Sequence, residues 1–400
     1  MARRAAYIRL FRGVYPSAPI LWLDSGSFSG DASMAGQLQT ETLIEGMNRL
    51  GYAAANVTDR EMIGGLERFL KVAKLARFPL ISANIVFQDG GRSILPPYTV
   101  VTLPPEAWRG SVPLRVGILG LAKERPTFLE FTKNGKKVII EPPIPAAARL
   151  VPSLARDTDV VILLTNMNSI VVNRLLRQVP GIDVVLAGYG ERISDNQAIP
   201  PAARVLYAGS QGKRLGEVRL FLGQGRVMNH VASHLFLDRR YPGEATMEAL
   251  ETAGNARINE HYRKLADENP VRVAANLPAK SRYVGAESCQ DCHGDAFQVW
   301  QRSGHQHAIQ TLIDAGQEYN PLCVTCHVTG FQVGNGFQNY TATPEFADVQ
   351  CEQCHGPAGA HMEDPTLPYG RTGQAKCLSC HTSDNSPEFE FSSYWESVRH

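Results

Sequence analysis

The eight cysteines of this 400-residue chain lie in its last third, and their spacing constrains what that part can fold around. The first 288 residues contain no cysteine. The eight form four C-x-x-C-H motifs, at residues 289–293, 323–327, 351–355 and 377–381, with no cysteine left over.

Each motif has the spacing of a covalent haem attachment site. Two thiols within one turn of chain reach the two vinyl groups of a haem, and the adjacent histidine then lies against the iron as its proximal ligand. We therefore expect four haem c groups. They would be attached through Cys289, Cys292, Cys323, Cys326, Cys351, Cys354, Cys377 and Cys380, with His293, His327, His355 and His381 as proximal ligands.

Zinc sites and disulfide bonds are the alternative uses of paired cysteines. Zinc accounts for cysteine pairs, but it gives no reason for a histidine after all four of them. Residues 283–400 also contain few aliphatic side chains, so this segment would bury too little apolar surface to fold alone. Haem groups would fill its core.

The other histidines are candidates for the distal side of each iron. The chain has eleven histidines, four of which belong to the motifs, which leaves seven. Met362 is the single methionine after residue 283, so histidine–methionine ligation from this region can serve at most one haem. We expect bis-histidine ligation and low potentials for the others. The distal candidates are the four in the haem region, His305, His307, His361 and His400.

Two alternatives stay open for these histidines. Each of the four could instead lie on the surface or contact a haem propionate. One haem could also be five-coordinate, which would leave an open iron of the kind an enzyme needs. Outside the haem region, His230, His234 and His261 are expected to have no ligand role.

Residues 7–227 alternate short apolar runs with segments of helical periodicity, which predicts an α/β layered fold with mixed sheets flanked by helices. Helices are expected at 37–50 and 65–76. Strands are expected at 20–23, 80–86, 114–119, 160–164, 184–187, 205–208 and 218–222. We predict an α/β domain over 1–237, a helical connector over 238–282 with a charged helix at 244–269, and a mainly α and irregular tetrahaem domain over 283–400.

The charge and the hydropathy of the chain indicate neither a nucleic-acid partner nor a membrane-spanning segment. The chain has 40 Lys and Arg against 39 Asp and Glu, and this near neutrality gives no argument for binding nucleic acid. No apolar run approaches the roughly 18 to 20 residues that span a bilayer, so we expect no transmembrane segment.

Four segments around the motifs carry a more specific signal. They are Tyr283-Val-Gly-Ala-Glu-Ser-Cys289, Trp300-Gln-Arg-Ser-Gly-His305-Gln-His307-Ala, Cys326-His327-Val-Thr-Gly-Phe and Cys351-Glu-Gln-Cys354-His355-Gly-Pro-Ala-Gly-Ala-His361. Together they resemble the cytochrome c-554 family of multihaem proteins. The resemblance implies closely stacked haems that relay electrons, mostly bis-histidine ligation, and a distal role for His361.

The first domain contains a second set of recognisable segments. Among them are Leu21-Trp-Leu-Asp24-Ser-Gly26-Ser, Pro79-Leu-Ile-Ser-Ala-Asn84, Asp159-Val-Val-Ile-Leu-Leu-Thr-Asn166 and Gly181-Ile-Asp183-Val-Val-Leu-Ala-Gly188. In order and spacing they resemble the metallophosphoesterase domain of 5'-nucleotidases, which implies that fold.

The positions that hold two metal ions in that family are changed in this chain. The bridging aspartate is replaced by Ser27, the Asn-His-Glu element reads Asp59-Arg60-Glu61, the next histidine is Asn166, and the Gly-His-x-His element reads Gly188-Tyr189-Gly190-Glu191. Two-metal chemistry needs both cations clamped close together, so we expect no phosphoesterase activity by that route. Asp24, Asp59 and Asp183 remain, and we expect them to be caps or solvated ends.

The same resemblance places the family's first strand before residue 1, so we expect a longer native precursor. Residues 1–7 are basic, and residues 8–12 that follow predict an amphipathic helix rather than an apolar signal segment. Haem c is attached outside the cytoplasm, so a periplasmic or extracellular location with an export signal is expected.

Three hypotheses for function follow. The first is an exported electron carrier with a catalytically dead nucleotidase-like docking domain, whose partners are other cytochromes or a membrane quinone-linked complex. The second is a haem enzyme acting on a small nitrogen or sulfur species at a five-coordinate haem. The third is a module that binds a ligand or a partner near Asp24, Asn166 and Tyr189. Association into a homo-oligomer is left open.

Overall fold

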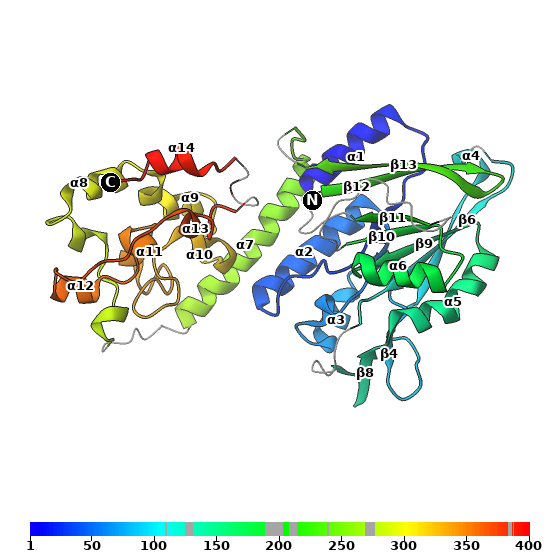
Figure 1. The fold of residues 1–400 in the computed structure, drawn as a ribbon, viewed down its shortest axis with the longest axis horizontal. Helices are drawn as coiled ribbons and strands as arrows, with labels where there is room; N and C mark the ends of the chain where they lie inside the picture. Colours follow the sequence, from blue (N-terminus) through cyan, green and yellow to red (C-terminus); the bar gives the residue numbers. More distant parts are fainter. Residues whose placement is uncertain are drawn as a thin grey trace. The chain divides into compact units, whose positions relative to one another are not determined.

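The computed structural model describes residues 1–108, 110–124, 131–133, 135–188, 203–207, 214–237, 240–268, 277–382, 386 and 388–400. The chain forms two compact units, Met1–Thr252 and Ala253–His400. Figure 1 shows that the sheets belong to the first unit and that the second consists largely of short helices. The boundary falls within helix α7 (Ala245–Glu268), inside the segment predicted as a connector.

A five-stranded sheet with the order β11-β10-β9-β6-β5 forms the centre of the first unit. Its strands are β5 (Tyr98–Leu103), β6 (Leu114–Leu121), β9 (Val160–Thr165), β10 (Val184–Ala187) and β11 (Arg204–Tyr207). All neighbouring strands are parallel except β5 and β6. Alternate residues of β9 enter two different apolar cores, Leu163 on one face and Ile162 on the other. Because both faces are buried, these strands are continuous apolar runs.

Helices α5 (Pro143–Asp157) and α6 (Ser169–Gln178) cover one face of this sheet through an apolar stripe that includes Val151 and Leu175. Asn168 caps α6, because its side chain accepts a hydrogen bond from Val171 N at 3.1 Å.

A parallel three-stranded sheet with the order β1-β2-β3 lies in the same unit. It consists of β1 (Trp22–Asp24), β2 (Tyr52–Asn56) and β3 (Leu80–Ile81), connected through α2 (Met34–Leu50), η1 (Arg60–Met62) and α3 (Leu66–Ala73). The remaining elements of the unit are α1 (Ala2–Val14), α4 (Pro105–Trp108), the sheet of β4 (Ile85–Phe87), β8 (Lys136–Ile140) and β7 (Phe131–Lys133), and the hairpin of β12 (Arg214–Gly223) and β13 (Arg226–Phe236). These mixed sheets flanked by helices confirm the predicted α/β layered class.

The second unit has a small apolar core of its own. The described part of this unit contains no named strand. Its elements after α7 are η2 (Ala279–Ser281), η3 (Ala286–Cys289), α8 (Gly294–Gln301), η4 (Gly304–His307), α9 (Ala308–Asp314), α10 (Pro321–His327), η5 (Pro344–Phe346), α11 (Cys351–His355), α12 (Gly359–Glu363), α13 (Gln374–Cys377) and α14 (Phe391–Glu396). The buried residues of its core are Tyr283, Ile309, Leu312, Val324, Val328, Phe337 and Phe346.

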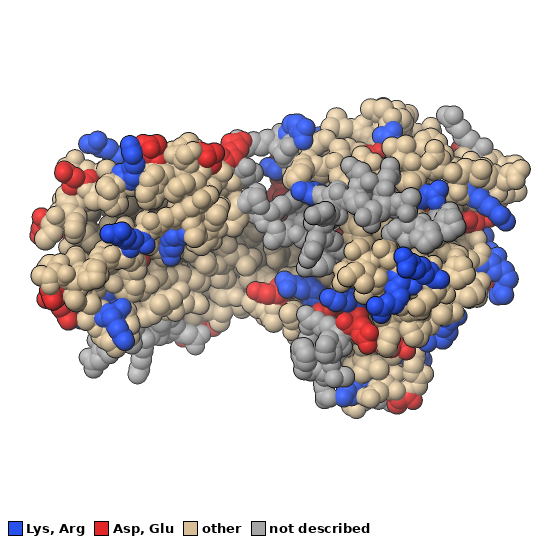
Figure 2. Space-filling model, viewed as in Figure 1, with Lys and Arg blue, Asp and Glu red and all other residues tan. Residues whose placement is uncertain are grey.

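Charged side chains of both signs appear on the face of each unit drawn in Figure 2. This mixture agrees with the formal net charge of +1. Among the described helices, none is long and apolar enough to cross a membrane.

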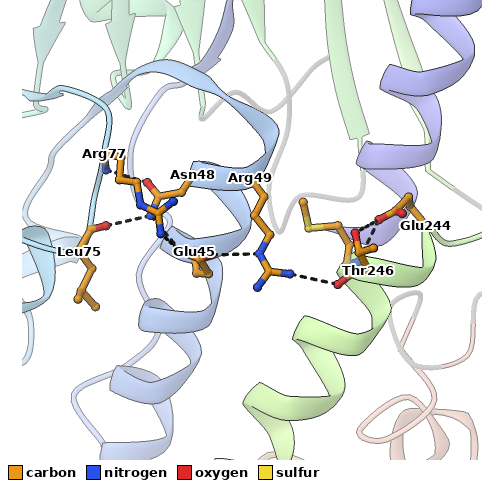
Figure 3. A network of polar contacts seen from close by, with 8 residues as sticks. Glu45, Asn48, Arg49, Leu75, Arg77, Glu244 and Thr246 are labelled. Carbon is orange, nitrogen blue, oxygen red and sulfur yellow. Dashed lines mark hydrogen bonds and ion pairs between the residues drawn. The ribbon is translucent and has the colours of Figure 1, made fainter.

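A polar network on the first unit connects α2 with the segments before β3 and at the start of α7 (Figure 3). Glu45 pairs with Arg49 at 3.0 Å and with Arg77 at 3.3 Å, and Arg49 donates to the carbonyl oxygen of Thr246 at 3.4 Å. Glu244 accepts a hydrogen bond from Met247 N at 3.0 Å at the beginning of α7. The side chains of Glu45, Arg49 and Arg77 are partly or largely exposed, and exposed ion pairs contribute little to stability.

A buried carboxylate holds the loop that follows β1. Glu61 is 5% exposed and accepts hydrogen bonds from the backbone N–H groups of Ser27 (3.2 Å), Ser29 (3.1 Å) and Thr58 (2.8 Å), and from the Thr58 hydroxyl (2.8 Å). A buried carboxylate without such donors would be costly, so loop and carboxylate stabilise each other.

This arrangement predicts that Glu61→Gln loosens the loop. A glutamine amide nitrogen cannot accept, so at least one backbone N–H group loses its partner, at a cost of about 1.5 kcal/mol or more. We expect roughly tenfold faster amide hydrogen exchange in peptides covering residues 25–31 and 56–60, measured by mass spectrometry. Glu45→Gln is the matched surface control and should leave both peptides unchanged. Equal exchange in the Glu61→Gln and unsubstituted proteins would contradict the role given to Glu61.

Candidate haem sites

Each C-x-x-C-H motif forms a single helical turn. Two motifs are the helices α10 and α11 themselves, where Asn320 caps α10 by accepting from Leu322 N at 3.1 Å. In the other two, the histidine N–H bonds back to the carbonyl oxygen of the first cysteine, at 2.9 Å for His293 and 2.8 Å for His381. Residues three apart lie on one side of such a turn, so both thiols point the same way. None of the eight cysteines forms a disulfide bond.

The thiols bring the motifs together in two pairs. Cys289 hydrogen-bonds to Cys351, and this contact raises the pKa of Cys289 and lowers that of Cys351. Burial, with Cys380 nearby, raises the pKa of Cys326 to about 11. The first motif is therefore a neighbour of the third, and the second motif is a neighbour of the fourth.

Three motif histidines face another histidine. The ring centroids are 6.1 Å apart for His293 and His361, 6.1 Å for His381 and His305, and 5.8 Å for His355 and His400.

This spacing fits one metal ion between the two rings of each pair. Imidazole nitrogens bind metals at about 2 Å, and the ring centre lies about 1 Å behind the nitrogen, which gives a centroid separation of about 6 Å across a metal ion. The three pairs therefore have the separation that bis-histidine ligation requires.

Hydrogen bonds at Nδ1 orient most of these rings. Nδ1 donates to the carbonyl oxygen of Ala308 from His327 (2.7 Å), of Gly370 from His355 (2.6 Å), of Leu367 from His361 (2.9 Å) and of Val398 from His400 (3.0 Å). A proton on Nδ1 leaves the Nε2 lone pair available to a metal. Burial also lowers the pKa of His305 and of His381, which favours the neutral, ligating form.

His327 and His307 differ from the three pairs. Within the described residues, no second histidine ring contacts His327, and His307 is exposed. Both lie near Asp348, whose carboxylate accepts from Ile309 N at 2.8 Å. Of the four distal candidates, His305, His361 and His400 each make a ring contact with a motif histidine, and no such contact is found for His307 within the described residues. His230 and His234 lie on β13 and His261 lies on α7.

Sequence reasoning missed the residues that support these rings. Tyr369 stacks on His355 and His361, and Phe389 stacks on His381. Asp348 has φ 69°, a left-handed conformation that is uncommon outside glycine. A sequence pattern could not identify these residues, because they lie outside the motifs. They reach the histidine rings only when the loops between the motifs are folded.

Hydroxyl and amide side chains contact one another at the changed metal-binding positions that the structure describes. The Ser27 hydroxyl lies 3.1 Å from the Thr58 hydroxyl and 3.4 Å from Asn166 Nδ2, and Asn166 Oδ1 accepts from Lys123 N at 2.7 Å. Asp183 accepts from Val161 N at 2.8 Å, as a strand-end cap. In the residues that the structure describes, no three His, Cys, Asp or Glu side chains gather as a metal site. Positions 189–191 lie outside them.

Different known proteins match the two units of the chain. The family model described as cytochrome c554 and c-prime matches residues 288–356, and a doubled C-x-x-C-H motif matches residues 344–386. Cytochrome c-554 of Nitrosomonas europaea is 29% identical over 115 residues, which is 25% of this chain and 47% of that protein.

The first unit matches phosphoesterases. A 2',3'-cyclic-nucleotide 2'-phosphodiesterase/3'-nucleotidase of Yersinia enterocolitica is 25% identical over 185 residues, 43% of this chain and 28% of that protein. The fold is similar to sulfate thiohydrolase SoxB of Thermus thermophilus (TM-score 0.55, 19% identity, 65% of this chain and 47% of that one). It is also similar to a 5'-nucleotidase precursor of the same organism (TM-score 0.50, 20% identity, 79% of this chain and 62% of that one).

The chain thus spans about half or less of the curated relatives that it matches. Its N-terminal unit has the expected 5'-nucleotidase-like metallophosphoesterase fold, and its C-terminal unit carries the haem-attachment motifs of a multihaem c-type cytochrome similar to cytochrome c-554.

Proposed function

We propose that this chain carries electrons outside the cytoplasm through four haem c groups. The observation that supports this most strongly is the centroid spacing of the three histidine pairs. In this proposal the first haem lies between His293 and His361, the third between His355 and His400, and the fourth between His381 and His305. Haem c supplies reversible one-electron chemistry, and the protein sets its potential through the axial ligands and their hydrogen bonds.

The second haem would have His327 as its single histidine ligand. Its Nδ1–H donates to the Ala308 carbonyl oxygen, so the Nε2 lone pair is available to iron, and no second histidine ring contacts it among the described residues. This observation favours a second candidate function, in which a small nitrogen or sulfur species reacts at this haem. The three paired sites would then deliver electrons to that site.

The nucleotidase-like unit would serve as a docking or structural module without phosphoesterase activity. Its support is the hydrogen-bonded network of Ser27, Thr58 and Asn166 at positions where the resembling enzymes hold metals. The alternative role as a ligand-binding module involves Tyr189, which lies outside the described residues.

Partners and location follow from the redox role. We expect redox proteins as partners, either other cytochromes or a membrane quinone-linked complex. Covalent haem attachment requires cysteine thiols to be handled outside the cytoplasm, which supports a periplasmic or extracellular location. Whether the chain forms a homo-oligomer does not affect this proposal.

The first test combines a pyridine haemochrome assay with electron paramagnetic resonance of the oxidised holoprotein. We expect four haems per chain, three low-spin and one high-spin. Four low-spin haems would remove the support for the enzyme candidate. A protein without covalent haem would contradict the whole proposal.

Histidine substitutions assign the distal ligands. His305→Ala, His361→Ala and His400→Ala should each convert one low-spin signal to high-spin, because each removes one of two axial ligands. His307→Ala is the matched control and should leave the spectrum unchanged. A high-spin conversion in His307→Ala would instead assign that residue to an iron.

A metal analysis tests the nucleotidase-like unit. After incubation with Mn²⁺ and desalting, the holoprotein should contain iron from haem and only trace manganese or zinc by mass spectrometry. Hydrolysis of bis-p-nitrophenyl phosphate should stay at the level of buffer containing Mn²⁺. Stoichiometric manganese with metal-dependent hydrolysis would show that this unit is active.

A further inference from the structure

Residues 367–370, between α12 and α13, contact two histidines that belong to different haem sites. His361 Nδ1 donates to the carbonyl oxygen of Leu367 at 2.9 Å, and His355 Nδ1 donates to that of Gly370 at 2.6 Å. The Tyr369 ring stacks on both imidazoles, with centroids 5.3 Å from His361 at 14° and 5.5 Å from His355 at 25°.

Further contacts fix this loop against α11. The Tyr369 hydroxyl donates to the carbonyl oxygen of Gly356 at 2.5 Å. A Cβ atom at residue 370 would overlap the carbonyl oxygen of His355, so this close approach requires glycine. The stacked ring and the two carbonyl acceptors therefore have defined positions relative to both histidines.

The two histidines face different partners. His361 lies opposite His293 of the first motif, whereas His355 belongs to the third motif and lies opposite His400. The thiol contact between Cys289 and Cys351 independently makes these two motifs neighbours.

We propose that residues 367–370 couple the first and third haem sites, with Tyr369 as a positioning residue for the axial imidazoles of both. The proposal rests on the haem ligation proposed above. Hydrogen bonds from Nδ1–H make an imidazole a stronger donor to its metal, and such supporting contacts tune affinity and potential. Because one ring packs on both imidazoles, a change at Tyr369 alters the orientation of the two ligands together.

The fourth motif provides an internal control. His381 has its own supporting contacts, with the Phe389 ring stacked at 4.8 Å and 15° and with the Ser386 hydroxyl 2.9 Å from Nδ1. None of the contacts given for His381 involves residues 367–370. Removing the Phe389 ring should therefore affect one haem, whereas removing the Tyr369 ring should affect two.

The experiment compares Tyr369→Leu, Tyr369→Phe and Phe389→Leu in the loaded holoprotein. The readouts are the low-spin electron paramagnetic resonance signals, assigned with the histidine variants, and the midpoint potential of each haem by spectroelectrochemistry. Tyr369→Leu should shift the signals and potentials of the first and third haems and leave the fourth unchanged. Phe389→Leu should shift only the fourth. Tyr369→Phe keeps the stacked ring and should stay near the unsubstituted protein at all three.

Haem content by pyridine haemochrome checks that each variant is loaded. If Tyr369→Leu does not load fully, Tyr369→Met replaces it under the same criteria, because it keeps side-chain bulk without a flat ring. A shift at one haem only, at all three equally, or at none would overturn the coupling. The ligation proposal fails separately, if the unsubstituted protein lacks low-spin haem.

Discussion

The helical turn that presents two thiols and a histidine is the constraint on which the second unit depends. Its own core consists of a few aromatic and aliphatic residues around Phe337 and Val328, and its helices are mostly one or two turns long. Short helices are unstable without tertiary packing, and a core of this size buries little apolar surface. Flat, apolar haem groups attached at these turns would provide the missing contact area, and folding and cofactor attachment would then belong to one process.

The first unit is stabilised in a different way, because its sheet is buried on both faces by the protein's own side chains. Of the changed metal-binding positions that the structure describes, Ser27 follows β1 and Asn166 follows β9, and neither side chain belongs to these cores. They can therefore change without loss of the fold. Ser27 keeps a left-handed φ of 64°, and Glu61 still holds the surrounding loop through backbone N–H groups. The loop is therefore held by hydrogen bonds to a carboxylate, with a serine hydroxyl at the position of the bridging aspartate.

The strands that could be predicted are those with continuous apolar runs, such as β6 and β9. The predicted strand at 80–86 is two strands in different sheets, because Asn84 turns its side chain to the carbonyl oxygens of Ala122 and Glu141, both at 2.8 Å. The sequence Tyr52–Asn56 was not recognised as β2, since three alanines carry no β-strand preference. The polar strand β13 was missed because only one of its faces packs on the core.

For the candidate haem sites, the proximal histidines could be predicted and the pairing of the distal ones could not. The reason is how far each histidine lies along the chain from the motif that it serves. A proximal histidine directly follows its second cysteine, so a local pattern identifies it. The histidine opposite His293 is His361, and the one opposite His381 is His305, so each pair closes a long loop. Closing such loops costs conformational entropy, which the proposed metal ligation would offset. Counting the free histidines of the haem region does not distinguish His307 from His305. His307 is two residues from His305 yet exposed, because the turn of η4 directs the two side chains differently. Pairing is therefore a property of the folded loops.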